Sequence, residues 1–116
     1  MFMVYVDTST TDMKIGMMHM MAAMCKDYAM FMPIKDDITR KMNEEYVSGI
    51  TYKTGNKYIK LFNERGGVLG FVVNVDNDKK FEKGDILKAA GYNAPARNFA
   101  RGNILKGGYN IMWTGA

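Results

Sequence analysis

Two arginines spaced four residues apart, Arg97 and Arg101, are the side chains of this sequence best suited to a chemical task. Pro95 near the start of their segment and Gly102 just after it predict a short helix over residues 94–101. Because residues four apart share a helix face, both guanidinium groups would point the same way and form a two-pronged clamp. The expected ligand carries a phosphate group, since guanidinium donates two parallel hydrogen bonds to phosphate.

Amide and amine side chains flank the two arginines and complete a candidate ligand-binding set. Asparagine both donates and accepts hydrogen bonds, and the free backbone amides at a helix start favour an anion. The alternative interpretation is that both arginines pair with nearby carboxylates, such as Glu82 or Asp85, and stabilise the fold. The candidate ligand-binding residues are Arg97, Arg101, Asn93, Asn98, Asn103 and Lys88.

The stretch around these residues, KGDILKAAGYNAPARNFARGNI from Lys83 to Ile104, is followed by Trp113-Thr114-Gly115. This pattern resembles a group of small, largely uncharacterised accessory proteins of tailed bacteriophages. The resemblance extends over residues 58–115. It implies a viral accessory protein that takes part in host interaction or anti-defence, and it implies no particular activity.

The composition indicates one folded domain over residues 1–116. Hydrophobic residues make up 47% of the chain and aromatic residues 12%, which fits a globular protein. A lone cysteine, Cys25, cannot form an internal disulfide, so we expect the reducing host cytoplasm. The apolar run at the start is too short for a signal peptide. His19, Lys26 and Asp27 interrupt the longest apolar stretch, so we expect no membrane span.

The net charge of +4 is unevenly distributed. Residues 1–48 contain 5 Lys or Arg and 7 Asp or Glu, whereas residues 49–116 contain 11 and 5, a net charge of +6. Such a basic half attracts anionic partners. If it binds a nucleic-acid backbone, several of its lysines should share one face. These lysines are Lys53, Lys57, Lys60, Lys79, Lys80, Lys83 and Lys88.

The first half of the chain predicts a strand at residues 2–6 and then two helices. Apolar residues recur every three or four positions from residue 12 to 31, and Pro33 ends this first helix. A second helix, from residue 36 or 37 to 46, forms a hairpin with the first. The wide apolar stripe of the first helix implies burial against a sheet or a second copy. We expect a homo-oligomer, with one of four methionines near its contact: Met17, Met20, Met21 or Met24.

The same helix raises the question of a soft-metal site. It contains seven of the twelve methionines, together with His19 and Cys25, and thioether, imidazole and thiolate groups suit Cu(I). Methionine at helical spacing more often fills a core or an adaptable interface, and the clustered Cys and His pairs of a zinc site are missing. The sequence leaves the choice between metal site and core open, and we expect no metal.

The second half of the chain predicts strands. Residues 50–53 and 57–62 form a hairpin, residues 68–75 are the most apolar strand and hence the centre of the sheet, and Gly70 marks a bulge or a close approach. Residues 86–90 form either a strand or a helical turn. The last strand, residues 109–113, contains Trp113 as a core residue. The predicted fold is α+β: an N-terminal Met-rich helical hairpin packed on an antiparallel sheet of about five strands.

The chemistry-bearing residues favour binding over catalysis. The sequence has no nucleotide-binding glycine loop with its lysine, no metal-ligand cluster and no legible nucleophile–base pair. We therefore expect a protein that is not an enzyme, uses no cofactor and sequesters a nucleotide or cyclic nucleotide. One alternative is a nucleic-acid-binding protein. The other is an inhibitor directed at a host protein.

Overall fold

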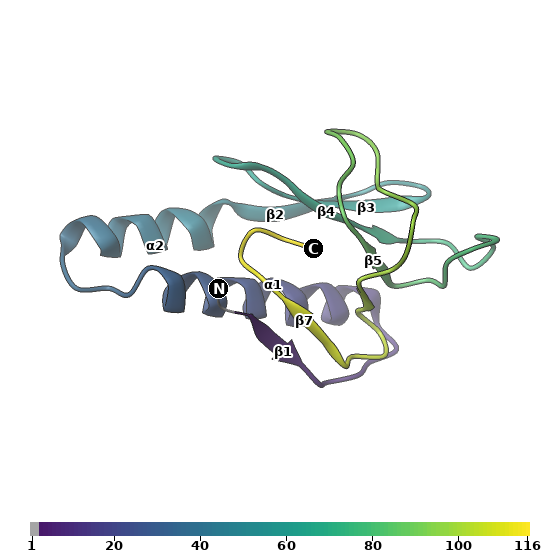
Figure 1. Ribbon diagram of the computed structural model, residues 1–116, viewed down its shortest axis with the longest axis horizontal. Coiled ribbons are helices and arrows are strands. Elements are labelled where there is room, and N and C mark those ends of the chain that lie inside the picture. The colour runs from purple at the N-terminus through teal and green to yellow at the C-terminus, as the bar shows by residue number, and fades with distance from the viewer. Residues whose placement is uncertain (1–2) are drawn as a thin grey trace.

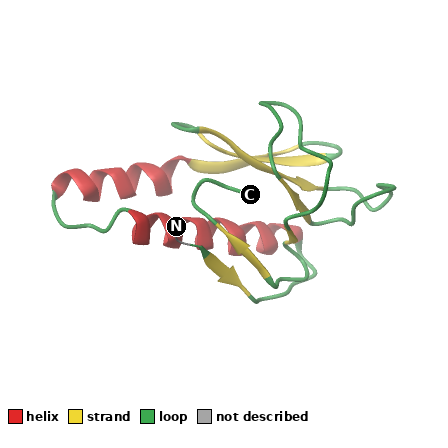
Figure 2. Cartoon of the chain, viewed as in Figure 1, coloured by secondary structure: helices red, strands yellow, loops and turns green. Residues whose placement is uncertain are grey.

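The computed structural model describes residues 3–116, which form an elongated α+β body of 49 × 28 × 23 Å (Figures 1 and 2). Two helices are followed by a five-stranded antiparallel sheet, and a second sheet of two strands joins the chain ends. This architecture confirms the predicted fold class. The elements are β1 (Val4–Val6), α1 (Met13–Phe31), α2 (Asp37–Gly49), β2 (Ile50–Thr54), β3 (Tyr58–Asn63), β4 (Gly67–Val73), β5 (Asp85–Leu87), β6 (Gly102–Asn103) and β7 (Tyr109–Ile111).

The five-stranded sheet has the order β2-β3-β4-β5-β6, with every neighbouring pair antiparallel. The central strand is β4, as its apolar sequence predicts. The pairing of β3 with β4 shifts between Leu61 and Phe62, which face Gly70 and Val68. A Cβ atom at Gly70 would lie 3.2 Å from the carbonyl oxygen of Leu87. Gly70 therefore marks both the bulge and the close approach that the sequence indicates.

Both faces of β4 are buried, because neighbouring strand residues point to opposite sides. Val72 is fully buried in the larger apolar cluster, where the α1 methionines Met17 and Met24 are also fully buried. Phe71 and Val73 belong to a second cluster on the other face, which the segment 88–101 helps to cover. The sheet is thus a middle layer between α1 and this segment.

The segment that carries Arg97 and Arg101 differs from its prediction, because residues 94–101 contain no helix. Pro95 forms an isolated antiparallel bridge with Ala89, and the Ala96 N–H donates to the Lys88 carbonyl at 2.7 Å. Further along, the Arg101 N–H donates to the Ile86 carbonyl at 2.7 Å. These backbone groups bond to the chain leading out of β5, so they are not free for a helix of about two turns, which is marginal in isolation.

The chain ends pair with each other rather than with the main sheet. The predicted last strand is present as β7, and it pairs antiparallel with β1. Residues 1 and 2 of the predicted first strand lie outside the described residues. The open choice at residues 86–90 resolves to the strand β5, which ends at Leu87.

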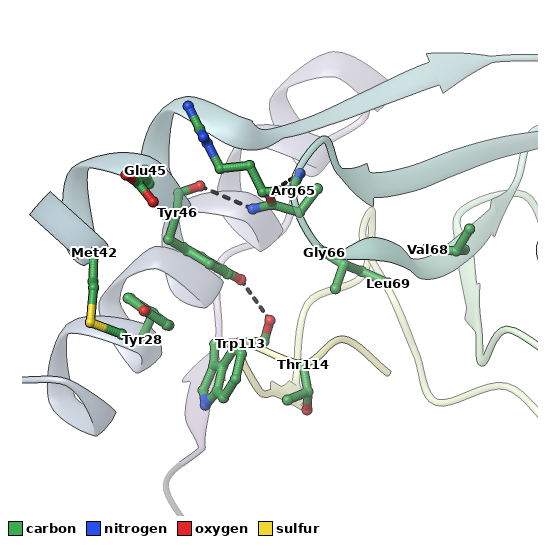
Figure 3. Close-up of a pocket in the computed structure, with 11 residues that line it drawn as sticks. Tyr28, Met42, Glu45, Tyr46, Arg65, Gly66, Val68, Leu69, Trp113 and Thr114 are labelled. Carbon is green, nitrogen blue, oxygen red and sulfur yellow. Dashed lines mark hydrogen bonds between the residues drawn. The ribbon is translucent and has the colours of Figure 1, made fainter.

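The C-terminal segment after β7 folds back onto β4. Gly115 has φ +103°, and a Cβ atom there would lie 1.9 Å from the Leu69 carbonyl oxygen, so glycine is required. The Tyr46 hydroxyl donates a hydrogen bond to the Trp113 carbonyl at 2.6 Å (Figure 3). The Trp113 N–H donates to Asp27 at 2.8 Å. These contacts hold Trp113 against both helices.

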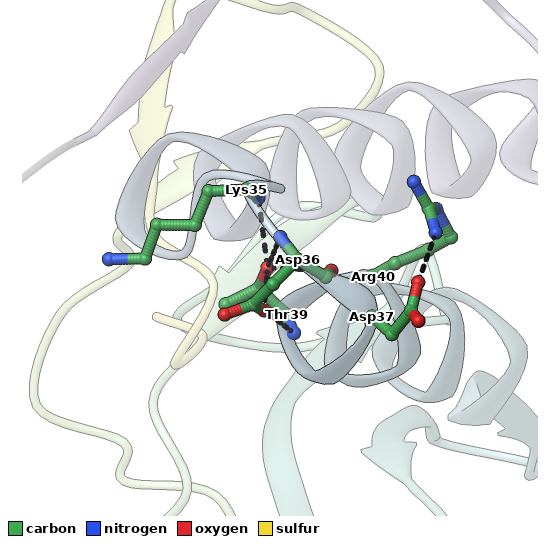
Figure 4. Close-up of polar contacts among 5 residues, drawn as sticks. All are labelled: Lys35, Asp36, Asp37, Thr39 and Arg40. Carbon is green, nitrogen blue, oxygen red and sulfur yellow. Dashed lines mark hydrogen bonds and ion pairs between the residues drawn. The ribbon is translucent and has the colours of Figure 1, made fainter.

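Both helices begin at an aspartate, as the sequence predicts. The Asp12 carboxylate accepts from the backbone amides of Lys14 and Ile15 at the start of α1. At the start of α2, the Asp36 carboxylate accepts from the Thr39 amide at 2.8 Å (Figure 4). This hydrogen bond lowers the pKa of the Asp36 carboxyl group. Thr39 bonds back to the Asp36 amide, which completes a capping box.

We expect Thr39→Val to reduce the free energy of unfolding by about 1–2 kcal/mol. The buried Thr39 hydroxyl accepts from the amides of Lys35 and Asp36 and donates to the Asp36 carboxylate, and valine of similar volume removes all three hydrogen bonds. Urea titration measures the loss. Thr54→Val, at an exposed position of β2, is the matched control. Equal changes in the two variants would contradict the role of the cap.

Candidate functional site

Four lysines gather at one end of the five-stranded sheet, which we call the basic end: Lys53, Lys57, Lys60 and Lys79. Lys53 and Lys60 are register partners in the β2–β3 hairpin, and Lys57 lies in its turn. The antiparallel course of β3 and β4 brings the loop after β4, with Lys79, to the same end. The Asn74 N–H donates to the Lys57 carbonyl at 2.8 Å and joins the two loops.

Two adjoining depressions, of about 360 and 490 Å³, lie between these lysines. Asn56 and Lys57 line both of them. Among the described residues that line them, Asp78 carries the one carboxylate, and this group is already paired with Arg97. The lysine charges at the basic end are therefore left without a carboxylate partner in either depression, and the surface favours an anion.

A contact between Lys60 and the segment 88–101 forms one wall of the basic end. The Lys60 ammonium group lies 3.5 Å from the centre of the Tyr92 ring and donates to the Asn93 side-chain oxygen at 3.0 Å. Tyr92 is 66% exposed, so much of its ring remains open to solvent. Of the candidate residues, Asn93 thus belongs to the basic end. Tyr92 was missed; its one signal in the sequence is an aromatic side chain between the turn-forming residues Gly91 and Asn93.

Arg97 borders the second depression, but its guanidinium group is engaged inside the protein. It donates to the Asp78 carboxylate at 2.9 Å and to the Tyr58 hydroxyl at 2.5 Å, and it lies 4.9 Å from the centre of the Phe81 ring. The Asp78 side chain is 1% exposed. The hydrogen bond from Arg97, together with the backbone amides of Lys80 and Phe81, holds the pKa of Asp78 well below its usual range.

Arg101 lies at another site. Its guanidinium group is 4.2 Å from the centre of the Phe99 ring, and it lines a separate depression with Tyr109 and Met112. Its buried Nε makes no hydrogen bond with the described residues. The predicted two-arginine clamp is therefore wrong, because the helix that would align Arg97 with Arg101 does not form. Arg97 agrees with the alternative interpretation, in which the arginine pairs with a nearby carboxylate, and its partner is Asp78.

The remaining candidate residues do not converge on a ligand site. The Asn98 side chain accepts from the Phe99 amide at 2.9 Å, which is a local turn contact. Asn103 is 7% exposed, and its side-chain oxygen accepts from the amides of Leu105 and Lys106 at 2.8 and 3.0 Å, so it stabilises the turn after β6. Lys88 is exposed and lines neither depression of the basic end.

Three methionines of α1 belong to the core, whereas Met18 and Met30 on the same helix are exposed. Met17, Met20 and Met24 are each at most 1% exposed, so they cannot lie at a surface contact between copies. Burial raises the pKa of the half-buried Cys25 thiol, and His19 bonds to the Thr8 hydroxyl. Within residues 3–116, no three His, Cys, Asp or Glu side chains are grouped to hold a metal ion. Self-association stays a prediction, and of the four methionines only the partly buried Met21 remains a candidate for its contact.

No family model matches the chain, no curated protein matches its sequence, and no solved structure matches its fold. Within the described part of the chain, neither helix has the length and apolar character needed to cross a membrane. Among these findings, the geometry of the basic end is the one that points to a function.

We expect the Arg97–Asp78 pair to make stability depend on pH. Folding lowers the pKa of Asp78 from its ordinary value of 3.8 and so favours the ionised carboxylate. The stabilisation is fully present above about pH 4 and is lost as the pH falls through the folded-state pKa. Asp78→Asn should lower the melting temperature at pH 7, and its difference from the wild type should shrink below about pH 4.

Thermal unfolding between pH 7 and pH 2 measures this difference. Asp76→Asn is the control, since Asp76 is exposed in the same loop. Arg97→Lys should also lower the melting temperature at pH 7, because lysine cannot reach the carboxylate and the Tyr58 hydroxyl with one planar group. A melting-temperature difference for Asp78→Asn that stays constant with pH would contradict the ion pair.

Proposed function

We propose that the protein binds a nucleic-acid strand at its basic end and sequesters it without catalysis. The observation that carries this proposal is the convergence of Lys53, Lys57, Lys60 and Lys79 around two joined depressions whose one carboxylate is already paired. Lysine ammonium groups contact successive phosphates as point charges and release counterions from the strand. The proposed ligand bears phosphate groups, as the sequence analysis expects, but lysines and not arginines are proposed to contact it.

The shape of the basic end favours a strand over the single nucleotide that the sequence analysis put first. A nucleotide site is typically a pocket that encloses most of its ligand. Here Lys53, Lys57 and Lys79 are exposed, Lys60 is half-buried, and the depressions adjoin each other through Asn56 and Lys57. An extended backbone can contact both depressions at once, whereas one nucleotide would leave most of the lysines unused.

The exposed ring of Tyr92 favours a single strand. Unpaired bases stack on aromatic side chains, and this contact is worth about 1–3 kcal/mol per base and tolerates any sequence. Lys60 lies close to the Tyr92 ring, so a phosphate bound at Lys60 would bring an adjacent base near that ring. In the phage setting implied by the sequence resemblance, such a protein would act on viral or host nucleic acid in the host cytoplasm.

We expect Lys57→Gln to weaken binding of a short single-stranded oligonucleotide and to flatten its salt dependence. Lys57 lines both depressions, and removing one phosphate-binding charge should reduce the slope of log affinity against log salt by about 0.7. Fluorescence anisotropy of a labelled oligonucleotide measures both quantities. Lys41→Gln on α2 removes the same charge far from the basic end and is the control. Identical slopes for the two variants would remove the proposed site.

We expect Tyr92→Ala to separate base stacking from charge. It should weaken oligonucleotide binding about five-fold or more, since it removes one stacking contact, and it should leave binding of inorganic polyphosphate unchanged. Competition against the labelled oligonucleotide measures both ligands. Equal weakening for both would show that the tyrosine acts only by positioning Lys60. If the wild-type protein bound adenosine triphosphate more tightly than the oligonucleotide, a nucleotide and not a strand would be the ligand.

A further inference from the structure

A second site lies at the end of the sheet opposite the basic end. The β3–β4 turn, the last turns of α2 and the C-terminal segment border a pocket of about 390 Å³, which we call the aromatic pocket (Figure 3). Its volume lies in the range of small-ligand sites, about 300–1,000 Å³, as do the volumes of the two depressions at the basic end, so the chemistry of its lining decides what it binds. The residues that matter most for its chemistry are Tyr28, Tyr46, Trp113, Glu45, Arg65 and Leu69.

Two aromatic walls of the pocket meet at nearly right angles. The rings of Tyr28 and Tyr46 are stacked, with centres 4.4 Å apart and planes 5° from parallel. The Trp113 ring stands at 77° to Tyr28 and 81° to Tyr46. Leu69, together with neighbouring residues of β4, provides an aliphatic wall. This corner presents aromatic π-systems from two directions, an arrangement that suits a compact cation.

The walls of the aromatic pocket are held in place before any ligand binds. The Tyr46 hydroxyl donates to the Trp113 carbonyl at 2.6 Å, which ties the two walls together. The Trp113 N–H donates to Asp27 at 2.8 Å. A ligand therefore meets ordered rings, and little of its affinity is spent on ordering them.

Two acidic residues lie near this corner. Asp27 is fully buried next to Trp113 and does not line the pocket; its Oδ1 has no hydrogen-bond partner among the described residues, and it forms no ion pair with them. Glu45 lines the pocket and is likewise without an ion pair in residues 3–116. The last turn of α2 contains no basic residue, so the negative end of its helix dipole is not offset there.

One lining residue opposes this field. Arg65 is exposed in the β3–β4 turn, and its side chain extends toward α2 (Figure 3). This exposed guanidinium group at the rim opposes the Glu45 carboxylate, and solvent screens it more than it screens the half-buried Glu45.

We infer that the aromatic pocket binds an organic cation with an apolar body, of the quaternary ammonium class. Such a group gains from the rings and from the Glu45 carboxylate together, and it is only weakly hydrated. A neutral ligand of the same shape would gain from the rings alone, and an anion would meet Glu45. The cation is either a free small molecule or a methylated lysine side chain of a protein. This site shares no lining residue with the basic end.

Trp113 provides a direct reporter, because it is the one tryptophan of the sequence and it lines the pocket. Titration with choline chloride, at constant ionic strength set with sodium chloride, should change the tryptophan emission in a saturable way. The uncharged isostere 3,3-dimethyl-1-butanol should bind about five-fold more weakly or worse. Equal binding of the two, or no saturable change with choline, would overturn the inference.

Matched variants on α2 test the charge. Glu45→Gln should weaken choline binding and leave binding of the uncharged isostere unchanged, whereas Glu44→Gln removes the same charge from a residue that does not line the pocket and should change neither. Arg65→Gln should tighten choline binding. Equal effects of Glu45→Gln and Glu44→Gln would show that choline responds to the overall charge of α2 and not to a residue of the pocket, and this would overturn the inference. A trimethyllysine peptide that binds more tightly than choline would support the inference with a protein side chain as the source, and tighter choline binding would support a free ligand.

Discussion

Burial of β4 on both faces is the constraint on which the rest of the structure depends. Phe71, Val72 and Val73 are each at most 3% exposed, and they point alternately to the two sides of the sheet. Burying each such side chain stabilises the fold by about 1.5–3 kcal/mol, but only if something covers it. The chain before the sheet provides α1 for one side. The chain after β4 provides segment 88–101 for the other.

The need to cover the second face explains why Arg97 is not free to bind a ligand. The apolar side chains of segment 88–101 are mostly small alanines, and its large ones, Tyr92 and Phe99, are exposed, so burial alone fixes it weakly to the sheet. Arg97 adds a polar attachment, since it joins this segment to Asp78 in the β4–β5 loop and to Tyr58 at the start of β3. Lys53, Lys57 and Lys79 form no ion pair with the residues lining the two depressions, where Lys57 has only the Tyr58 ring at 5.6 Å, and their charges remain for an external partner.

Local patterns predicted most of the fold. Capping aspartates and apolar periodicity located α1 and α2, turn residues located the β2–β3 hairpin, and continuous apolar sequence identified β4 as the centre. These signals act within a few residues, so a single sequence contains them. The prediction for segment 94–101 failed because Pro95 and Gly102 fit a helix locally, while the bonds that decide its course run to Ile86 and Lys88.

The candidate site depended even more on distant contacts. Asn93 and Arg97 lie at the basic end, but Arg101 and Asn103 do not. All four were predicted to form one site only because they are close in sequence. Charge asymmetry indicated a basic half without saying where its lysines meet. That Lys53 and Lys79 share an end follows only from strand order. The aromatic pocket was missed for the same reason, because Tyr28 and Trp113 come from opposite ends of the chain.

Strands β3 and β4 connect the two proposed sites and determine how they relate. Tyr58 at the first residue of β3 lines a depression of the basic end, and Asn63 at its last residue lines the aromatic pocket. The two strands are paired from one site to the other. Coupling between two sites requires an element that has two arrangements and whose equilibrium both ligands shift. A paired strand in the buried centre of a sheet has a single arrangement. A nucleic-acid strand at one end and an organic cation at the other should therefore bind independently, each with the same affinity whether or not the other is bound.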